Sequence, residues 1–360
     1  MKRVFITDCE GPISKNDNAF EASSRFIPNG DELFALVSKY DDVLADFVKK
    51  PGYNAGDTLK LILPFFKAYG VTDERLREFS DNKLVLIAGS KNTLGHVRSL
   101  APSFIVSTSY EHYIKALCKA LDFPFENTYC TRLSLDKYLL SEREKSRLRL
   151  LAEQIVQMPM IIIPPFAKSQ DDFSEYDQKN IRRLDEIFWK EISAMNIGKI
   201  FKEVKPIGGS QKAEAIKEAA EKSHVQLSDV FYVGDSITDV EAFKIVRNNG
   251  GLTVSFNGNQ YAVKNAEIAV MADNNIVIEV INELWCKLGK AETLEVIKNW
   301  SVTTLRQSPL SRLVQERLFT LYPVMLPKLQ IVTPQNMETL VRESSDFRKK
   351  VRGRIVGRLG

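Results

Sequence analysis

Residues 230–239 read VFYVGDSITD, and this stretch indicates the class of fold. Its first four residues are apolar and either β-branched or aromatic, as in the strands of parallel sheets, which are buried on both faces. The strand ends at Gly234 and is followed by two acids, Asp235 and Asp239, with three residues between them. Residues 240–246 then have helical spacing. A buried strand, a polar turn and a helix, in that order, are typical of an α/β unit.

The same order of strand, polar turn and helix recurs along the chain. The other apolar runs that we interpret as strands are residues 3–7, 104–106, 252–256 and 268–271. This repetition predicts a doubly wound parallel sheet. In such sheets ligands bind beyond the carboxyl ends of the strands. Asp8, Ser107 and Asp235 all follow a predicted strand directly or nearly so, and we therefore expect them at one edge of the sheet.

Two long segments interrupt the α/β pattern. Apolar residues recur at helical spacing within residues 15–82, which predicts a helical insert. Residues 131–204 are charged and partly helical in pattern, and we interpret them as a second insertion, either a further cap or an interaction surface. Residues 291–360 are expected to form a mostly helical C-terminal extension that ends in a basic tail. The ranges that remain for the α/β core are 1–14, 83–130 and 205–290.

The composition excludes several classes of protein. Of the 360 residues, 44% are hydrophobic and 27% are charged, the balance of an ordinary globular protein. The longest apolar run, residues 158–166, is interrupted by prolines and is shorter than the ~20 residues of a membrane span. The first residues lack the apolar stretch of a signal peptide. Four widely spaced cysteines without a C-x-x-C pattern favour neither a disulfide framework nor a zinc site, so we expect a cytoplasmic protein.

The net charge of +4 is concentrated at one end of the chain. The last twenty residues hold seven Lys and Arg side chains against two acidic ones, and the rest of the chain is close to neutral. Nucleic-acid binding is therefore not expected from overall charge. We interpret the basic tail as a solvated helix end, with binding of RNA, DNA or anionic lipid as the alternative.

Asp8 and Glu10 are two acids separated by one residue just beyond a predicted strand. In an extended backbone their side chains point the same way, so both could face one pocket. Neighbouring carboxylates repel, and one tends to hold a proton unless a cation lies between them. One can then act as nucleophile and the other as general acid and base. The alternative is an ordinary turn in which Asp8 caps free amides and Glu10 is solvated.

Asp235 and Asp239 supply a second acid pair, and Asp8 would lie near them if the two strands are neighbours. Magnesium prefers oxygen ligands, usually one or two carboxylates with waters and a substrate phosphate. Asp8 and Asp235 would meet this requirement. Thr238 and Glu241 offer the alternative interpretation, since their spacing is that of a helix capping box.

Three further residues could hold an anion. Ser107 and Thr108, at the end of a strand, offer hydroxyl and backbone donors. Lys212, at the start of a helix after two glycines, could contact a carboxylate and a phosphate oxygen together. Helix caps contain the same residue types, most such lysines are solvated, and Lys217 is a competing candidate. The order along the chain (acid pair, hydroxyl, lysine, acid pair) favours a site.

In this order the sequence resembles the haloacid dehalogenase-like phosphohydrolases. The residues that carry the resemblance are Asp8-Cys9-Glu10-Gly11, Ser107, Lys212 and the GDSITD stretch at 234–239. It covers about half of the chain and is closest in pattern to the phosphoserine phosphatase-like branch, in which residues 15–82 would be the helical cap. A looser similarity is to archaeal proteins of this superfamily with no assigned substrate. The resemblance implies a Rossmannoid α/β core.

The resemblance also implies a magnesium-dependent phosphatase that hydrolyses a small phosphomonoester through an aspartyl-phosphate. Asp8 would be the nucleophile, and Glu10 would protonate the leaving alcohol and then activate water. The residues that would hold the transferring phosphoryl group are Ser107, Thr108 and Lys212. The residues that would bind or support Mg²⁺ are Asp8, Asp235, Asp239 and, through its backbone carbonyl, Glu10. Positioning and charge neutralisation are the main requirements of phosphoryl transfer.

Two residues depart from the family pattern: Glu10 stands where the usual acid is aspartate, and Pro12 removes an amide donor beyond the nucleophile. A phosphotransferase or mutase with the same intermediate is one alternative. Another is a weakly active binding module or complex subunit that docks a protein partner through residues 131–204 or the basic tail. A receiver-type signalling domain has no need of the two insertions.

Overall fold

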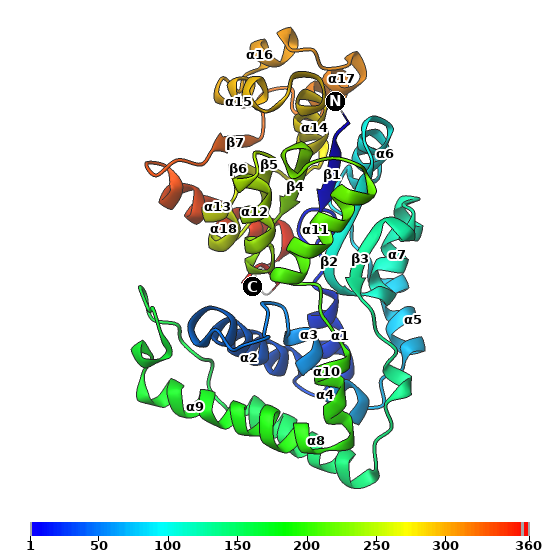
Figure 1. Cartoon of the computed structure of the whole chain (residues 1–360), viewed down its shortest axis with the longest axis vertical. Coiled ribbons are helices and arrows are strands. Elements are labelled where there is room, and N and C mark those ends of the chain that lie inside the picture. The colour runs from blue at the N-terminus through cyan, green and yellow to red at the C-terminus, as the bar shows by residue number, and fades with distance from the viewer. Residues whose placement is uncertain (1, 354–355, 359–360) are drawn as a thin grey trace.

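The structure is a computed structural model that describes residues 2–353 and 356–358. Within these residues the strands form one sheet in the order β3-β2-β1-β4-β5-β6-β7 (Figure 1). The strands are β1 (Val4–Thr7), β2 (Ser103–Tyr110), β3 (Thr128–Thr131), β4 (Val230–Gly234), β5 (Leu252–Phe256), β6 (Ile268–Met271) and β7 (Lys328–Ile331). Neighbouring strands are parallel except for β6 and β7, which are antiparallel. The predicted doubly wound α/β sheet is confirmed.

β1 and β4 are central neighbours in the sheet, and Asp8 and Asp235 follow their ends. The two strands are parallel with Thr7 opposite Val233, and the amide of Asp8 donates to the Val233 carbonyl at 2.8 Å. The chain continues from β1 to β2 on one side, whereas β4 lies on the other side. The crevice between β1 and β4 is therefore the switch point at which α/β sheets bind ligands.

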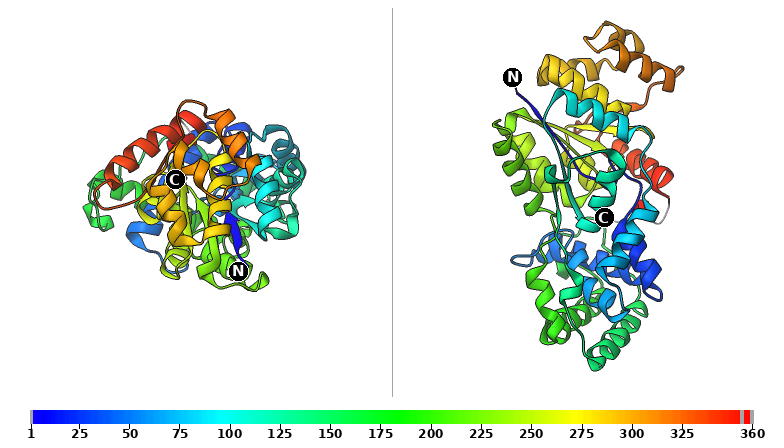
Figure 2. Two further views of the ribbon diagram at one scale, coloured as in Figure 1. Left: turned by 90° about the horizontal axis from the view of Figure 1, so that it is seen from above. Right: turned by 90° about the vertical axis from the view of Figure 1, so that its right-hand side faces the viewer.

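Helices cover both faces of the sheet (Figure 2). On one face lie α6 (Ser90–Leu100), α7 (Glu111–Leu121) and α14 (Ile276–Leu288), and on the other lie α11 (Ser210–Lys222) and α12 (Val240–Asn248). Alternate residues of β1 pack against the helices on opposite faces of the sheet. Phe5 packs on the face covered by α6, α7 and α14, whereas Val4 and Ile6 pack on the face covered by α11 and α12. Burial on both faces explains why this strand is a continuous apolar run.

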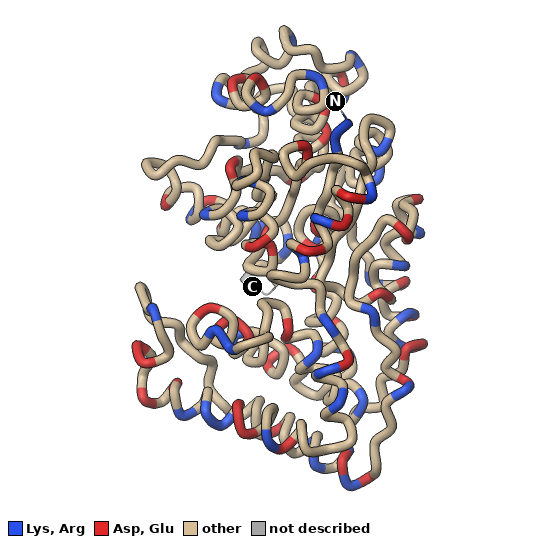
Figure 3. The backbone as a smooth tube through the Cα atoms, viewed as in Figure 1, with Lys and Arg blue, Asp and Glu red and all other residues tan. Residues whose placement is uncertain are grey.

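Residues 15–82 and 131–204 fold together into one helical body, which we call the cap, at the carboxyl edge of the sheet (Figure 1). Its longer helices are α1 (Asn18–Phe26), α2 (Gly30–Asp42), α4 (Leu63–Ala68), α5 (Asp73–Lys83), α8 (Glu142–Val156) and α9 (Glu175–Glu186). Tyr40 joins the two segments, since its hydroxyl donates to Asp185 at 2.5 Å and its ring stacks on Phe188. Acidic and basic residues alternate along α8 and α9 (Figure 3), as on an ordinary solvated surface.

The C-terminal region is more closely joined to the core than the sequence predicts. Its helices are α15 (Lys290–Lys298), α16 (Val302–Gln307), α17 (Arg312–Leu321) and α18 (Met337–Arg352). β7 adds an edge strand, and α18 packs Leu340 against β6. Ser344 donates to the Gly258 carbonyl at 2.7 Å. Among the described helices none is long and apolar enough to cross a membrane.

The expectation of a solvated basic tail is wrong for the end of α18. Leu340, Ser344 and Arg348 recur at intervals of four residues and form the buried face of this helix. The side chains of Arg348 and Arg352 are only 3% and 4% exposed, because both reach into the core. Arg354, also counted in the tail, lies outside the described residues.

Candidate active site

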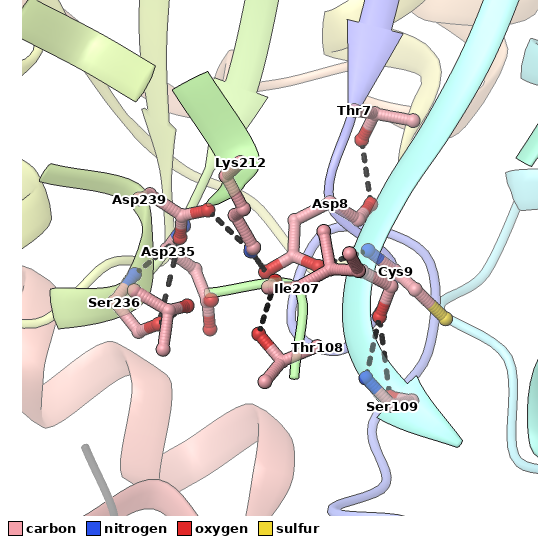
Figure 4. A network of polar contacts seen from close by, with 12 residues as sticks. Thr7, Asp8, Cys9, Thr108, Ser109, Ile207, Lys212, Asp235, Ser236 and Asp239 are labelled. Atoms are coloured by element: carbon pink, nitrogen blue, oxygen red, sulfur yellow. Dashed lines mark hydrogen bonds and ion pairs between the residues drawn. The ribbon is translucent and has the colours of Figure 1, made fainter. Parts of the chain in front are cut away.

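A buried lysine joins two of the predicted carboxylates. Lys212 Nζ donates to Asp8 Oδ2 and to Asp239 Oδ1, each at 2.6 Å (Figure 4). Its side chain is 0% exposed. Burial alone would lower the pKa of Lys212, but the carboxylates of Asp239 and Asp8 more than offset this and hold that pKa above its ordinary value. The lysine is therefore charged, and α11 is its rigid support.

Asp239 has all its acceptor positions engaged. Its Oδ1 also accepts from the Tyr232 hydroxyl at 2.6 Å. Its Oδ2 accepts from the backbone amides of Asp235 and Ser236, each at 2.9 Å. Although burial opposes ionisation, Lys212 and these donors hold the pKa of Asp239 below its ordinary value. Asp239 thus fixes the loop that carries Asp235, and it could support a cation only indirectly.

The capping box at the start of the helical turn after β4 is formed by other residues than the sequence suggests. Ser236 and Asp239 form the capping box, not Thr238 and Glu241. Glu241 instead forms an exposed ion pair with Lys244.

Asp8 is the carboxylate at the centre of the cluster. Its Oδ1 accepts from the amide of Cys9 at 2.6 Å, and its Oδ2 is held by Lys212. Burial raises the pKa of Asp8 to about 7, and the carboxylates of Asp239 and Asp235 add to this while Lys212 opposes it. A cation nearby would favour the ionised form.

Asp235 faces Asp8 from the neighbouring strand. Asp8, Asp235 and Asp239 each place one oxygen within 4.8 Å of the others. Clustered carboxylate oxygens are the kind of ligand that a hard divalent cation such as Mg²⁺ prefers. Asp235 Oδ2 contacts Nη1 of both Arg348 and Arg352, at 3.1 Å in the case of Arg352.

Gly11 packs directly against Asp235. A Cβ at this position would lie 2.0 Å from Asp235 Oδ2, and the backbone has φ +102°. The turn is closed by Ile13 and Ser14, whose amides donate to the Cys9 carbonyl at 2.8 and 3.0 Å. Pro12 lies within this turn, which is held by the amides of its neighbours.

We expect Gly11→Ala to destabilise the protein by about 3 kcal/mol, since it combines a strained φ with an overpacked contact. The control is Gly52→Ala. Gly52 has φ +73°, and a Cβ at this position would have no atom within 4 Å. This variant therefore isolates the cost of the backbone strain, about 1 kcal/mol. Urea unfolding of the two variants gives the comparison. Equal losses would show that the contact with Asp235 contributes nothing.

Glu10 points from the core toward the cap. Its Oε1 accepts from the amide of Asn18 at 2.7 Å, in the first turn of α1. Burial and the neighbouring Asp17 carboxylate raise the pKa of Glu10 well above its ordinary value. A protonated carboxyl next to a leaving group is what a general acid requires. Asp17 was not predicted as a site residue, because in the sequence it resembles any helix N-cap.

Ser107 and Thr108 lie within β2, which continues to Tyr110 and so extends beyond the strand predicted over 104–106, and the two residues differ in their contacts. The Ser107 hydroxyl donates to the Ser109 hydroxyl at 3.1 Å. The Thr108 hydroxyl donates to the Ile207 carbonyl at 3.0 Å and so ties β2 to the segment that leads into α11. Ser107 is therefore the better placed of the two to contact a substrate.

A cavity of about 100 Å³ lies between the core and the cap. The acids that line it are Asp8, Glu10, Asp17, Asp41, Asp42 and Asp235, and its lining includes the basic residues Arg348 and Arg352. Core and cap residues both line the cavity, so a movement of the cap would change access to it, as movements of caps over active sites commonly do.

Comparison with known proteins agrees with this fold. The family model of haloacid dehalogenase-like hydrolases matches residues 136–283, which include Lys212 and Asp235 but not Asp8. Gene product AF1437 from Archaeoglobus fulgidus aligns over 100% of this chain and 99% of its own, with TM-score 0.80 and 24% identity. No curated protein matches the chain.

Two phosphoserine phosphatase structures overlap less closely. The apo form covers 77% of this chain and 98% of its own, with TM-score 0.47 and 11% identity. The phospho-aspartyl intermediate analogue covers 78% and 98%, with TM-score 0.48 and 13% identity.

The match over residues 136–283 makes this part of the chain similar to the haloacid dehalogenase-like hydrolases, in agreement with the sequence resemblance, and the archaeal gene product shares the fold of the whole chain.

Proposed function

We propose that the protein is a Mg²⁺-dependent phosphatase that hydrolyses a small phosphomonoester through an aspartyl-phosphate. The observation that carries this proposal is the buried cluster of Asp8, Lys212 and Asp239 at the switch point of the sheet, next to a cavity under the cap. Such a cluster supplies a nucleophile and fixed positive charge where a phosphoryl group would be transferred.

The proposed reaction has two displacements. An Asp8 oxygen attacks phosphorus, and the bond from phosphorus to the alcohol breaks as Glu10 gives its proton to the departing oxygen. Ionised Glu10 then takes a proton from water, whose oxygen attacks the phosphorus of the aspartyl-phosphate and releases phosphate and Asp8. Ser107 and Lys212 hold the phosphoryl oxygens, with Thr108 shaping the loop beside them.

The residues that would hold Mg²⁺ are Asp8, Asp235 and the backbone carbonyl of Glu10, with Asp239 in support. The ion would neutralise charge on the phosphoryl oxygens. An aspartyl-phosphate could also pass to a second hydroxyl, so a phosphotransferase or mutase shares this geometry. A catalytically weak binding subunit is the second candidate, favoured by the two arginines at Asp235.

The test is phosphate release from sugar, amino-acid and nucleotide monophosphates with Mg²⁺. We expect EDTA to reduce the release to less than about a tenth and added Mg²⁺ to restore it, since the carboxylates would otherwise repel the substrate anion. Thermal unfolding with and without EDTA serves as the control for folding. Hydrolysis that is indifferent to chelation contradicts the cation's role, and no hydrolysis across the panel favours the binding subunit.

A further inference from the structure

Two arginines of α18 lie inside the candidate site. Arg348 and Arg352 are one helical turn apart, and Nη1 of each contacts Oδ2 of Asp235. Nη1 of Arg348 also donates to the backbone carbonyl of Asp235 at 3.3 Å. The packing of Leu340 and Ser344 fixes the helix on the core, so these contacts are part of the folded protein and not those of a loose tail.

The charge of the arginine pair equals that of a divalent cation. With its three aspartates ionised, the cluster carries three negative charges, of which Lys212 offsets one. Two negative charges remain in a buried site, where uncompensated charge is costly. Either a divalent cation or Arg348 together with Arg352 supplies the two positive charges that balance them.

Arg352 also holds the linker from β1 into the cap. Its Nε donates to the Lys15 carbonyl at 3.1 Å, and its Nη2 contacts the Asn16 carbonyl. Asn16 in turn accepts from the amide of Val85 at 2.8 Å, on the segment that returns from the cap. One guanidinium therefore connects Asp235 with the segments through which the cap joins the core.

We propose that Arg348 and Arg352 compete with the divalent cation for Asp235. The inference rests on the proposed function, since it takes Asp8 and Asp235 as ligands of the cation. A carboxylate oxygen that two guanidiniums already neutralise attracts a cation weakly, and the guanidiniums repel that cation. Binding of the cation therefore lengthens or opens the ion pairs at Asp235.

Opening these pairs also loosens the contacts of Arg352 with Lys15 and Asn16. Cation binding and the linker into the cap are then coupled, and by reciprocity a cap movement that pulls Arg352 away favours cation binding. α18 thereby makes loading of the site dependent on the position of the cap.

The first test measures Mn²⁺ binding to the full chain by electron paramagnetic resonance, with Mn²⁺ as a probe for a hard oxygen site. We expect Arg352→Gln to lower the dissociation constant by at least about ten-fold, since it removes one repelling charge. Lys349→Gln is the matched control: it removes one charge from the same helix, its side chain is 36% exposed, and it pairs with Asp346. We expect less than about a two-fold change for this control.

The second test needs no variant. Hydrogen exchange of wild-type protein is compared with and without saturating Mn²⁺, and faster exchange is expected in the last turns of α18 and at residues 15–16. Unchanged exchange in these segments overturns the proposal. The proposal is also overturned if Arg352→Gln binds Mn²⁺ as tightly as the wild type or more weakly. That outcome leaves the phosphatase proposal intact. Absence of Mn²⁺ binding in wild type and variant overturns the competition, while the phosphate-release assay decides separately on the proposed function.

Discussion

Replacement of Asp8 by asparagine is expected to lower phosphate release by at least about 1,000-fold. The amide is isosteric with the carboxylate but is a far weaker nucleophile, so the covalent intermediate does not form. Steady-state phosphate release with Mg²⁺, at saturating substrate, measures the loss in kcat. Retention of more than about a tenth of the wild-type rate would exclude the aspartyl-phosphate route.

The same variant is expected to be at least as stable as the wild type at pH 8. Burial raises the pKa of Asp8 to about 7 from 3.8, so the folded state binds a proton more tightly than the unfolded state. The stability that this proton supplies is lost as the pH rises through 7, and a neutral amide avoids the loss. Urea unfolding thus separates chemistry from folding. Glu241→Gln, which removes an exposed acid paired with Lys244, is the activity control.

Lys212→Met should have the largest effect on stability, about 3–5 kcal/mol, together with loss of activity. The substitution leaves the Asp8 and Asp239 carboxylates buried without their shared cation. Lys217→Met is the control on the same helix: Lys217 is 42% exposed and pairs with the exposed Glu214. Its expected change is within about 0.5 kcal/mol.

The pH dependence of Lys212→Met provides an independent check. Without the lysine, burial and mutual repulsion place the pKa of both carboxyls above the unfolded values. The folded variant therefore binds more protons than the unfolded chain, and its stability should rise as the pH falls. Urea unfolding between pH 8 and 5 measures the slope. A variant as stable as the wild type at pH 8 would show that Lys212 does not compensate the cluster.

The sheet and the placement of its acids could be predicted because both depend on local sequence. Apolar β-branched runs mark strands that are buried on both faces, and parallel strands bring their carboxyl ends to one edge. Asp8 and Asp235 follow such runs directly. Their roles in catalysis stay predictions until the variants are measured.

Local sequence patterns could not predict the short strands β3 and β7, nor that the two insertions form a single cap. β7 pairs with β6 from far along the chain, and its exposed residues give only a weak pattern. The two insertions share one apolar core. Each insertion shows helical periodicity in the sequence, but which apolar faces meet is decided by tertiary contacts such as that of Tyr40 with Phe188.

The spacing of residues along α18 carries a signal for the burial of its two arginines. Leu340, Ser344, Arg348 and Arg352 share one helical face, which marks the two arginines as lying on the buried side. The net charge of the C-terminal residues does not distinguish these two arginines from the exposed basic residues beside them. The contact with Asp235 joins residues more than one hundred positions apart, so no local pattern could reveal it.

The pairing of β1 with β4 has a consequence for biosynthesis. Val4 lies opposite Val230, so the first strand made must wait until more than 200 further residues have left the ribosome. At about 5–20 residues per second, this takes on the order of tens of seconds. During that interval the nascent chain exposes an apolar strand without its central neighbour. The crevice between β1 and β4, on which the candidate site depends, can therefore form only after synthesis has passed β4.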